Sequence, residues 1–254
     1  MATTDGRRIA LVTGAVGGVG LAATLRLARE GFTVVVNDVV DDGRLNALAK
    51  TIGGLALNAD ISTPESGSDM VRAVRERLGD IDVLVANAAV IALGPFLEQS
   101  QELWWRQIDV NLSGHFRLIQ SVVPSMCRAG GGRIVIIASG WGVVGESNAT
   151  AYSASKAGLI ALAKGLGREL GPQGILTNAI APSYIDTEQL QVDADFAQIT
   201  LEEMRQRYRE IIPTGQLATA DDIASVVAFL ASDAAAAFVG QVLQPSGGVT
   251  RTRA

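Results

Sequence analysis

Short runs of β-branched and aliphatic residues alternate along the chain with longer segments of helical periodicity. The apolar runs lie at residues 9–12, 33–36, 55–58, 81–85, 133–137, 176–180 and 239–243. The helical patterns lie at 18–30, 42–51, 64–78, 101–127, 152–170, 200–211 and 219–231. Runs that are apolar on both faces are typical of strands covered by helices on each side. The pattern therefore predicts an α/β fold, a doubly wound Rossmann-type sheet of seven parallel strands with helices on both faces.

One segment departs from this alternation. Residues 183–214 are rich in acids at first and then become helical, and long excursions of this kind in compact domains are usually lids or binding loops. No shift in composition indicates a linker. We therefore expect residues 1–254 to form a single nucleotide-binding domain with a substrate lid at about 183–214. Pro64, Asp221 and Asp222 suit the first turns of helices.

The first apolar run leads directly into a glycine-rich turn, TGAVGGVG at residues 13–20, and then into a helical pattern. Glycines at 14, 18 and 20 would allow a tight turn, a close approach of backbone amides to a pyrophosphate, and close packing of helix on strand. The turn therefore predicts a dinucleotide site, although a merely tight strand–helix connection would have a similar sequence.

Polar residues follow the next three predicted strands. Asp38 lies 18 residues after Gly20, where a carboxylate can accept both ribose hydroxyls of an adenosine and repel a 2′-phosphate. Asp60 and Ile61 follow the third strand, where they could reach the adenine edge, and Asn87 follows the fourth. Ligands bind beyond the carboxyl ends of the strands in such sheets. We therefore expect NAD rather than NADP.

The strongest local signal is Tyr152 followed four residues later by Lys156, because positions i and i+4 share one face of a helix. Ser139 ends the fifth predicted strand, where the sheet would open onto the crevice. A phenol with a pKa of about 10 is a poor base. We expect Lys156 and a cationic nicotinamide to lower that pKa, while Ser139 holds the reacting oxygen.

Taken together, these motifs resemble the short-chain dehydrogenase/reductase family, and more narrowly its 3-oxoacyl-[acyl-carrier-protein] reductase-like members, from Thr13 to Gly248. The resemblance implies a catalytic set of Asn111, Ser139, Tyr152 and Lys156, in which Asn111 helps to hold a water beside the lysine. It implies cofactor contacts from Gly14, Gly18, Val19, Gly20, Asp38, Asp60, Ile61, Asn87, Ala88, Tyr152, Lys156, Pro182, Ile185 and Thr187. Three positions depart from the family pattern: Ala89 and Ser183 replace glycines, and Ser246 replaces an aspartate.

Composition narrows the possible functions. Hydrophobic residues make up 48% of the chain and charged residues 19%, with a mean hydropathy of +0.27, which excludes a disordered chain. A net charge of −5 argues against a nucleic-acid binder. One cysteine, Cys127, and one histidine, His115, predict neither a disulfide nor a histidine-based metal site. Residues 9–25 lack charge, but glycines interrupt them, so we expect neither a signal peptide nor a membrane segment and predict a cytoplasmic protein.

The predicted function is an NAD-dependent oxidoreductase that interconverts a secondary alcohol and a ketone on a small-molecule substrate. A 3-oxoacyl-carrier-protein reductase, a non-catalytic cofactor-binding scaffold, and an epimerase or dehydratase are the alternatives. An acidic carrier protein would favour basic residues near the site; Arg128 is a candidate, whereas Gln173 stands at a position that is often basic in those reductases. A mostly apolar substrate pocket is expected from Trp141, Val143, Val144, Asn148, Tyr184, Phe196, Met204 and Tyr208.

Small residues recur along the pattern at 152–170, which permits a close approach of another helix. They are Ala154, Ala157, Gly158, Ala161, Gly165 and Gly167. The resemblance adds that the family commonly pairs this helix and the one near 101–127 across a twofold axis. We expect a homotetramer, or at least a homodimer.

Overall fold

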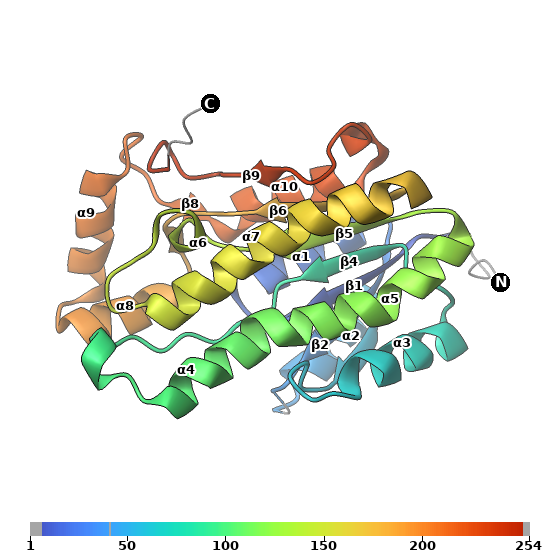
Figure 1. Ribbon diagram of the computed structural model, residues 1–254, viewed down its shortest axis with the longest axis horizontal. Coiled ribbons are helices and arrows are strands. Elements are labelled where there is room, and N and C mark those ends of the chain that lie inside the picture. The colour runs from blue at the N-terminus through green and yellow to red at the C-terminus, as the bar shows by residue number, and fades with distance from the viewer. Residues whose placement is uncertain (1–6, 41, 251–254) are drawn as a thin grey trace.

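The computed structural model of the protein describes residues 7–40 and 42–250, and one sheet of seven strands runs through it (Figure 1). The strands are β1 (Ile9–Thr13), β2 (Thr33–Asp38), β3 (Leu55–Asn58), β4 (Val83–Ala86), β5 (Gly132–Ile137), β6 (Ile175–Ile180) and β9 (Val242–Leu243). They are parallel throughout, in the order β3-β2-β1-β4-β5-β6-β9. The predicted doubly wound parallel sheet is confirmed.

Helices cover both faces of this sheet. They are α1 (Gly18–Arg29), α2 (Arg44–Ile52), α3 (Ser66–Arg77), α4 (Gln101–Ile108), α5 (His115–Ala129), α6 (Trp141–Val144), α7 (Thr150–Leu170), α8 (Gln189–Ala197), α9 (Leu201–Ile211) and α10 (Ala220–Ala231). One apolar core packs α3, α5 and α7 on one face, and a second packs α1, α2 and α10 on the other. Figure 1 shows α3, α5 and α7 in front of the sheet, with α1 and α10 behind it.

The centre of the sheet explains where a ligand can bind. Leu11 of β1 lies beside Val35 of β2 on one side and Leu84 of β4 on the other. The chain order reverses here, since β2 and β3 continue outward from β1 in one direction and β4 to β9 in the other. Loops that leave β1 and β4 consequently diverge, and a crevice opens beyond their carboxyl ends.

Several predicted boundaries differ from the structure. The pattern at 101–127 is divided by a π-helical segment, Asp109–Gly114, between α4 and α5. Pro64 does not lie in the first turn of α3, which begins at Ser66. Asp221 and Asp222 do lie in the first turn of α10, and Asp222 completes a capping box with Thr219.

The segment at 183–214 contains more structure than its sequence indicated. Besides the predicted helix, now α9, it holds α8 and the short strand β7 (Ile185–Asp186). β7 pairs with β8 (Ala218–Thr219) in a second, two-stranded sheet. Helices α8 and α9 pack together around a small apolar cluster that includes Leu190 and Met204. Three-residue 3₁₀ turns lie at Phe96–Glu98, Gly171–Gln173 and Asp233–Ala235.

Candidate active site

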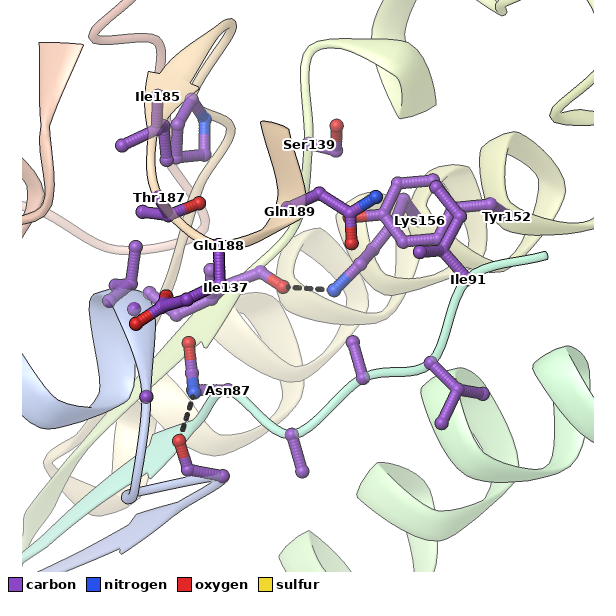
Figure 2. A pocket seen from close by; sticks show the side chains of 18 of the residues that line it. Asn87, Ile91, Ile137, Ser139, Tyr152, Lys156, Ile185, Thr187, Glu188 and Gln189 are labelled. Carbon is purple, nitrogen blue, oxygen red and sulfur yellow. Dashed lines mark hydrogen bonds between the residues drawn. The ribbon is translucent and has the colours of Figure 1, made fainter. Parts of the chain in front are cut away.

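A cavity of about 470 Å³ lies beyond the carboxyl ends of the central strands. The residues that line it come from the glycine turn, the ends of β2, β4 and β5, helix α7 and the 182–193 segment. Figure 2 shows Ser139, Tyr152, Lys156 and Asn87 around this space, together with Ile185 and Thr187 from the opposite segment. The topology thus brings the predicted proton-transfer and cofactor residues to one pocket, except for Gly20 and Asn111, which do not line it.

The glycine turn is shaped by steric need at two positions. Gly14 has a φ of +64°, and a Cβ there would lie 2.8 Å from the Cα of Ala88. A Cβ on Gly20 would lie 1.9 Å from the carbonyl oxygen of Gly14. Any side chain at either position would push β1, β4 and α1 apart, so glycine is required for close packing at this turn.

The start of α1 fits an anion. Gly17 is the N-cap of α1, no side chain caps the free amides, and a Cβ on Gly17 would meet nothing within 4 Å. Gly14, Gly17, Gly18 and Val19 line the cavity. Unpaired N–H groups and the helix dipole favour negative charge at such a helix start. The residues present therefore fit the pyrophosphate of a dinucleotide.

Asp38 lies beside this turn and faces the cavity. Its Oδ2 accepts a hydrogen bond from the Val16 amide at 3.2 Å, and its Oδ1 accepts one from the Val39 amide at 2.8 Å. The carboxylate is therefore held in place by backbone donors. Arg44, the nearest predicted cation, is paired with Asp42 through a 2.7 Å contact and does not line the cavity.

The residues after β3 and β4 also reach the cavity, but part of their role is structural. The Asp60 Oδ1 accepts hydrogen bonds from the amide and hydroxyl of Ser62, at 2.9 and 2.7 Å. The Asn87 side-chain amide donates to the carbonyl of Thr13 at 2.9 Å and to that of Gly14 at 3.1 Å. Ile61 and Ala88 line the cavity beside them. Asn87 thereby ties the end of β4 to the glycine turn, as its dashed bond in Figure 2 illustrates.

The 182–188 segment closes the cavity from the other side. Pro182, Ile185 and Thr187 all line it. The Thr187 side chain comes within 3.7 Å of the Cβ position of Gly18, so this segment touches the glycine turn. The Pro182 carbonyl accepts a 2.7 Å hydrogen bond from Gly140, which fixes the segment relative to the end of β5.

Ser139, Tyr152 and Lys156 meet at the centre of the pocket. The Lys156 Nζ is buried, donates to the Ile137 carbonyl at 2.8 Å and lies 5.5 Å from the centre of the Tyr152 ring. Ser139 follows β5, and its Oγ accepts a hydrogen bond from the Trp141 amide at 3.2 Å. Trp141 packs edge-on against Tyr152, with ring centres 5.9 Å apart, which holds the phenol in position.

The electrostatics of this group differ from the expectation. Burial raises the pKa of Tyr152 to about 12, although hydrogen bonding to Ser139 lowers it. Burial also lowers the pKa of Lys156 to about 7. Lys156 donates to a backbone carbonyl rather than to the phenol. The expected lowering of the Tyr152 pKa is therefore not found, because desolvation outweighs the hydrogen bond with Ser139 and the charge of Asp193 raises the pKa further.

Asn111 is close to this group but does not line the cavity. It is fully buried in the π-helical segment, where its side-chain amide donates to the Val90 carbonyl at 2.9 Å and the Ser155 Oγ at 3.2 Å. Its Oδ1 accepts from the Val90 amide at 2.8 Å. The side chain is thus engaged with protein partners, so it braces the 90–91 loop against α7 instead of pointing at the pocket.

The substrate side of the pocket was only partly predicted. Trp141, Tyr184 and Tyr208 line the cavity, but Asn148 does not, Val143, Val144 and Phe196 are exposed, and Met204 is buried between α8 and α9. Gln189 and Asp193 also line the cavity, and neither was expected from the sequence. The pocket is consequently less apolar than expected. Gln189 and Asp193 are four residues apart, which is compatible with one helix face, but no apolar periodicity predicted a helix there.

His115 and Cys127 have structural contacts. The His115 Nε2 lies 2.8 Å from the Ala88 carbonyl, and burial, aided by the charge of Lys156, lowers the pKa of this histidine to about 4. The Cys127 thiol donates to the Gln173 side chain at 2.9 Å. Arg128 pairs with Asp80 at 3.4 Å, near the amino ends of β4 and β5. Within one chain, Arg128 therefore does not lie near the active-site cavity, and the expectation that it would is wrong.

Comparisons with known proteins agree with this geometry. A family model described as enoyl-(acyl carrier protein) reductase matches residues 14–250. The chain is 35% identical over 245 residues to the 3-oxoacyl-[acyl-carrier-protein] reductase FabG of Staphylococcus epidermidis, covering 94% of this chain and 98% of the relative. The Escherichia coli strain K12 FabG is 35% identical over 244 residues, covering 95% and 97%.

The chain belongs to the short-chain dehydrogenase/reductase family. A solved structure of levodione reductase superposes with a TM-score of 0.90 at 30% identity, covering 95% of this chain and 96% of that one. The matched relatives are reductases of a family that uses a nicotinamide cofactor, and the chain is an oxidoreductase.

Two of the three departures from the short-chain dehydrogenase/reductase pattern lie in the cavity wall. Ala89 and Ser183 line the cavity, whereas Ser246 does not. Ser246 is buried, and its Oγ accepts a hydrogen bond from the Thr250 amide at 3.3 Å.

Within residues 7–40 and 42–250, no helix has the length and hydropathy to span a membrane, and no group of acids, histidine and cysteine has metal-site geometry.

Proposed function

We propose that the protein is an NAD-dependent oxidoreductase that interconverts a secondary alcohol and a ketone on a small molecule. The observation that carries this proposal is the meeting of Ser139, Tyr152 and Lys156 in a cavity that is continuous with the glycine turn and Asp38. A pure cofactor-binding scaffold would not need a phenol, a hydroxyl and a buried ammonium group at one point of its pocket.

Each side chain has a distinct role in the proposed reaction. When bound, a nicotinamide cofactor supplies or takes up the hydride. Ser139 would hold the reacting oxygen through its hydroxyl, and Tyr152 would give a proton to that oxygen or take one from it. Lys156 would stabilise the phenolate and bind a cofactor hydroxyl once it releases the Ile137 carbonyl. Asn111 is a positioning residue, because it holds Ser155 on the turn that also carries Lys156.

The size of the required electrostatic effect can be estimated. Burial raises the pKa of Tyr152 to about 12. Operation near neutral pH requires the phenolate to be stabilised by roughly 7 kcal/mol, since a tenfold change in acidity corresponds to about 1.4 kcal/mol. Lys156 in its ordinary charged form and the positive ring of an oxidised nicotinamide are the two cations available for this role. Proton transfer would thus depend on cofactor binding.

The preference for NAD rests on Asp38. Its carboxylate faces the cavity, and the Val16, Val39 and Val40 amides hold it there. At about 4 Å and an effective dielectric constant near 20, a 2′-phosphate would cost roughly 4 kcal/mol per unit charge before solvent relaxes. Among the described residues that line the cavity, Lys156 is the only cation, and it lies at the other end near Tyr152.

A 3-oxoacyl-carrier-protein reductase is the second candidate. The 35% identity to FabG proteins over most of the chain favours it. Against it, Arg128 is paired with Asp80 far from the pocket, Gln173 is uncharged, and carboxylates stand at the substrate end. We therefore rank a small alcohol or ketone first.

The test is a matched measurement of wild type and Tyr152→Phe. Reduced-nicotinamide absorbance is followed with NAD(H) and NADP(H) against a panel of alcohols, ketones and a 3-oxoacyl thioester. Wild type should turn over at least one small ketone or alcohol with NAD(H), and Tyr152→Phe should lose about 10²-fold or more in kcat while its cofactor Kd changes little. A variant that keeps more than about a tenth of the rate would remove Tyr152 from the chemistry.

We also propose that the protein is a homotetramer or homodimer, built through α4, α5 and α7. Leu103, Trp105 and Phe116 are exposed on α4 and α5, with Trp105 at 61%. Ala154, Ala157, Ala161 and Gly165 form an exposed stripe on α7, whereas Gly158 and Gly167 pack within the chain against Leu112 and Gly240. Light scattering at micromolar concentration tests this, and a monomer would refute it.

We also propose that the protein is located in the cytoplasm, since the single cysteine needs no oxidising compartment.

A further inference from the structure

The substrate end of the cavity holds a buried carboxylate that the proposed reaction does not use. Asp193 on α8 is 8% exposed and lines the cavity. Its Oδ2 accepts a hydrogen bond from the Tyr208 hydroxyl at 3.0 Å, and its Oδ1 accepts one from the Gln189 side chain at 3.3 Å. A carboxylate offers about four acceptor positions, so these two bonds leave capacity for a further donor.

Aromatic rings surround this carboxylate. The Tyr208 ring stacks on Tyr184 with centres 4.0 Å apart and planes 21° from parallel. Tyr184 lines the cavity together with Trp141, which packs against the catalytic candidate Tyr152. In Figure 2 the Gln189 side chain extends into the same pocket as Tyr152. A donor that reaches Asp193 would therefore bind among rings that exclude water, where a polar interaction is stronger than at the surface.

The charges at the substrate end of the cavity favour a hydrogen-bond donor on the substrate over an anionic group. Burial raises the pKa of Asp193, and the negative charge of Glu146 acts in the same direction. Next to the main effect of burial, the charge of Asp193 itself raises the pKa of Tyr152, so the carboxylate acts electrostatically on the proposed proton donor. Among the described residues, Arg207, which is exposed, is the cation whose charge lowers the pKa of Tyr184.

We propose that Asp193, held by Tyr208 and Gln189, is a specificity-determining residue that binds a hydrogen-bond donor on the substrate, remote from the reacting carbon. The donor is a hydroxyl or an ammonium group, and a carboxylate or phosphate at the same place is disfavoured. This inference rests on the proposed function, because it places the reacting carbon at Tyr152. Asp193 takes no part in hydride or proton transfer.

The experiment uses four acetophenones that differ only in the para substituent: aminomethyl, hydroxymethyl, ethyl or carboxylate. Wild-type kcat/KM should be about tenfold higher for the aminomethyl and hydroxymethyl compounds than for the ethyl compound, and lowest for the carboxylate. Asp193→Asn keeps the shape and an acceptor for Tyr208 but removes the charge. With each value taken as a ratio to the ethyl value of the same protein, it should bring the aminomethyl and carboxylate ratios within about threefold of each other. Asp195→Asn, an exposed position on the same helix, should behave as wild type.

A binding measurement separates this inference from the proposed function. The Kd values of the same four compounds are measured with cofactor-loaded Tyr152→Phe protein, with and without Asp193→Asn, so that the order of affinities is read without turnover. If wild type turns over none of the four compounds but their Kd values follow the expected order, the proposed oxidoreductase function is overturned and the Asp193 subsite is supported. An order that Asp193→Asn leaves unchanged would overturn the subsite.

Tyr208→Phe provides a second variant in case Asp193→Asn unfolds. It keeps the stacked ring and the buried carboxylate but removes one donor to it. The preference for aminomethyl over carboxylate should persist or increase, because the charge remains and one more acceptor position is free. A fall in that preference to below about threefold would contradict the assignment of Asp193.

Discussion

The cofactor end and the substrate end of the pocket are built in different ways. At the cofactor end, the site is formed mainly by backbone groups and glycines. Gly14 and Gly20 allow close packing, and the uncapped amides at the start of α1 face the cavity. At the substrate end, side chains from α6, α7, α8 and α9 converge, including Trp141, Tyr152 and Asp193. Backbone-built sites follow from one contiguous motif, whereas side-chain sites depend on how several elements dock.

Lys156 belongs to both ends, so its removal should have the largest effect. Lys156→Met keeps most of the hydrocarbon stem but removes the ammonium group. We expect kcat to fall by about 10²-fold or more and the cofactor Kd to rise, because the same group would stabilise the phenolate and bind the cofactor. Stopped-flow turnover and fluorescence titration of the cofactor measure the two effects. Lys164→Met, exposed on the same helix, is the control, and an unchanged Kd in Lys156→Met would confine Lys156 to the substrate end.

The cofactor end can be redirected through Asp38. Asp38→Ser combined with Val39→Arg removes the repelling carboxylate and adds a cation beside the expected position of a 2′-phosphate. The ratio of kcat/KM with NADP to that with NAD should rise by about ten- to a thousandfold. Asp195→Ser, which removes an exposed acid that does not line the cavity and is hydrogen-bonded to Gln191, should leave the ratio unchanged. If wild type already prefers NADP, Asp38 is only a cap for the Val16 and Val39 amides.

The backbone character of the cofactor end can be tested by stability. Gly20→Ala would place a methyl group 1.9 Å from the Gly14 carbonyl, so β1 and α1 must separate. We expect the free energy of unfolding to fall by about 3 kcal/mol. Gly165→Ala, on α7 with nothing within 4 Å of its Cβ inside the chain, should be neutral or stabilising by up to about 1 kcal/mol at a protein concentration where light scattering shows a monomer. Urea unfolding measures both, and equal effects would show that the turn can relax.

His115 contacts the carbonyl of Ala88, which lines the cavity between its two ends. The titration of His115 should have the smallest of these effects, and it makes the free energy of unfolding depend on pH. Burial lowers the pKa of His115 to about 4, so the unfolded chain binds more protons than the folded one between about pH 6.5 and pH 4. Stability is therefore fully present above pH 6.5 and falls as the pH is lowered. From pH 7 to pH 5 this histidine should account for roughly 2 kcal/mol.

His115→Gln keeps a donor for the Ala88 carbonyl and removes this titration. The chain has one histidine, so no other imidazole contributes to the difference. Urea unfolding of both proteins at pH 7 and pH 5 gives the comparison, with the variant losing less stability on acidification. Equal losses would mean that His115 becomes exposed before the protein unfolds.

The sequence was enough to predict the sheet, the seven strands and the glycine turn, because each follows from local patterns of apolar residues and from steric need at single positions. It also placed Ser139, Tyr152 and Lys156, because a strand end and an i, i+4 pair fix where they lie. Which groups act on these three side chains depends instead on contacts between distant parts of the chain. Packing buried Tyr152 and raised its pKa, joined Lys156 to the Ile137 carbonyl, and engaged the Asn111 side chain with Val90 and Ser155.

The substrate end was the least predictable part of the molecule. Asp193, Gln189 and Tyr208 became neighbours because α8 and α9 fold back over the cavity, and α8 left no clear pattern in the sequence. Burial, hydrogen bonding and charge depend on groups that are distant along the chain and close in space. Local periodicity contains no information about such pairs, and for this reason the sequence indicated the reaction class, whereas the docking of α8 and α9 defined the chemistry of the pocket.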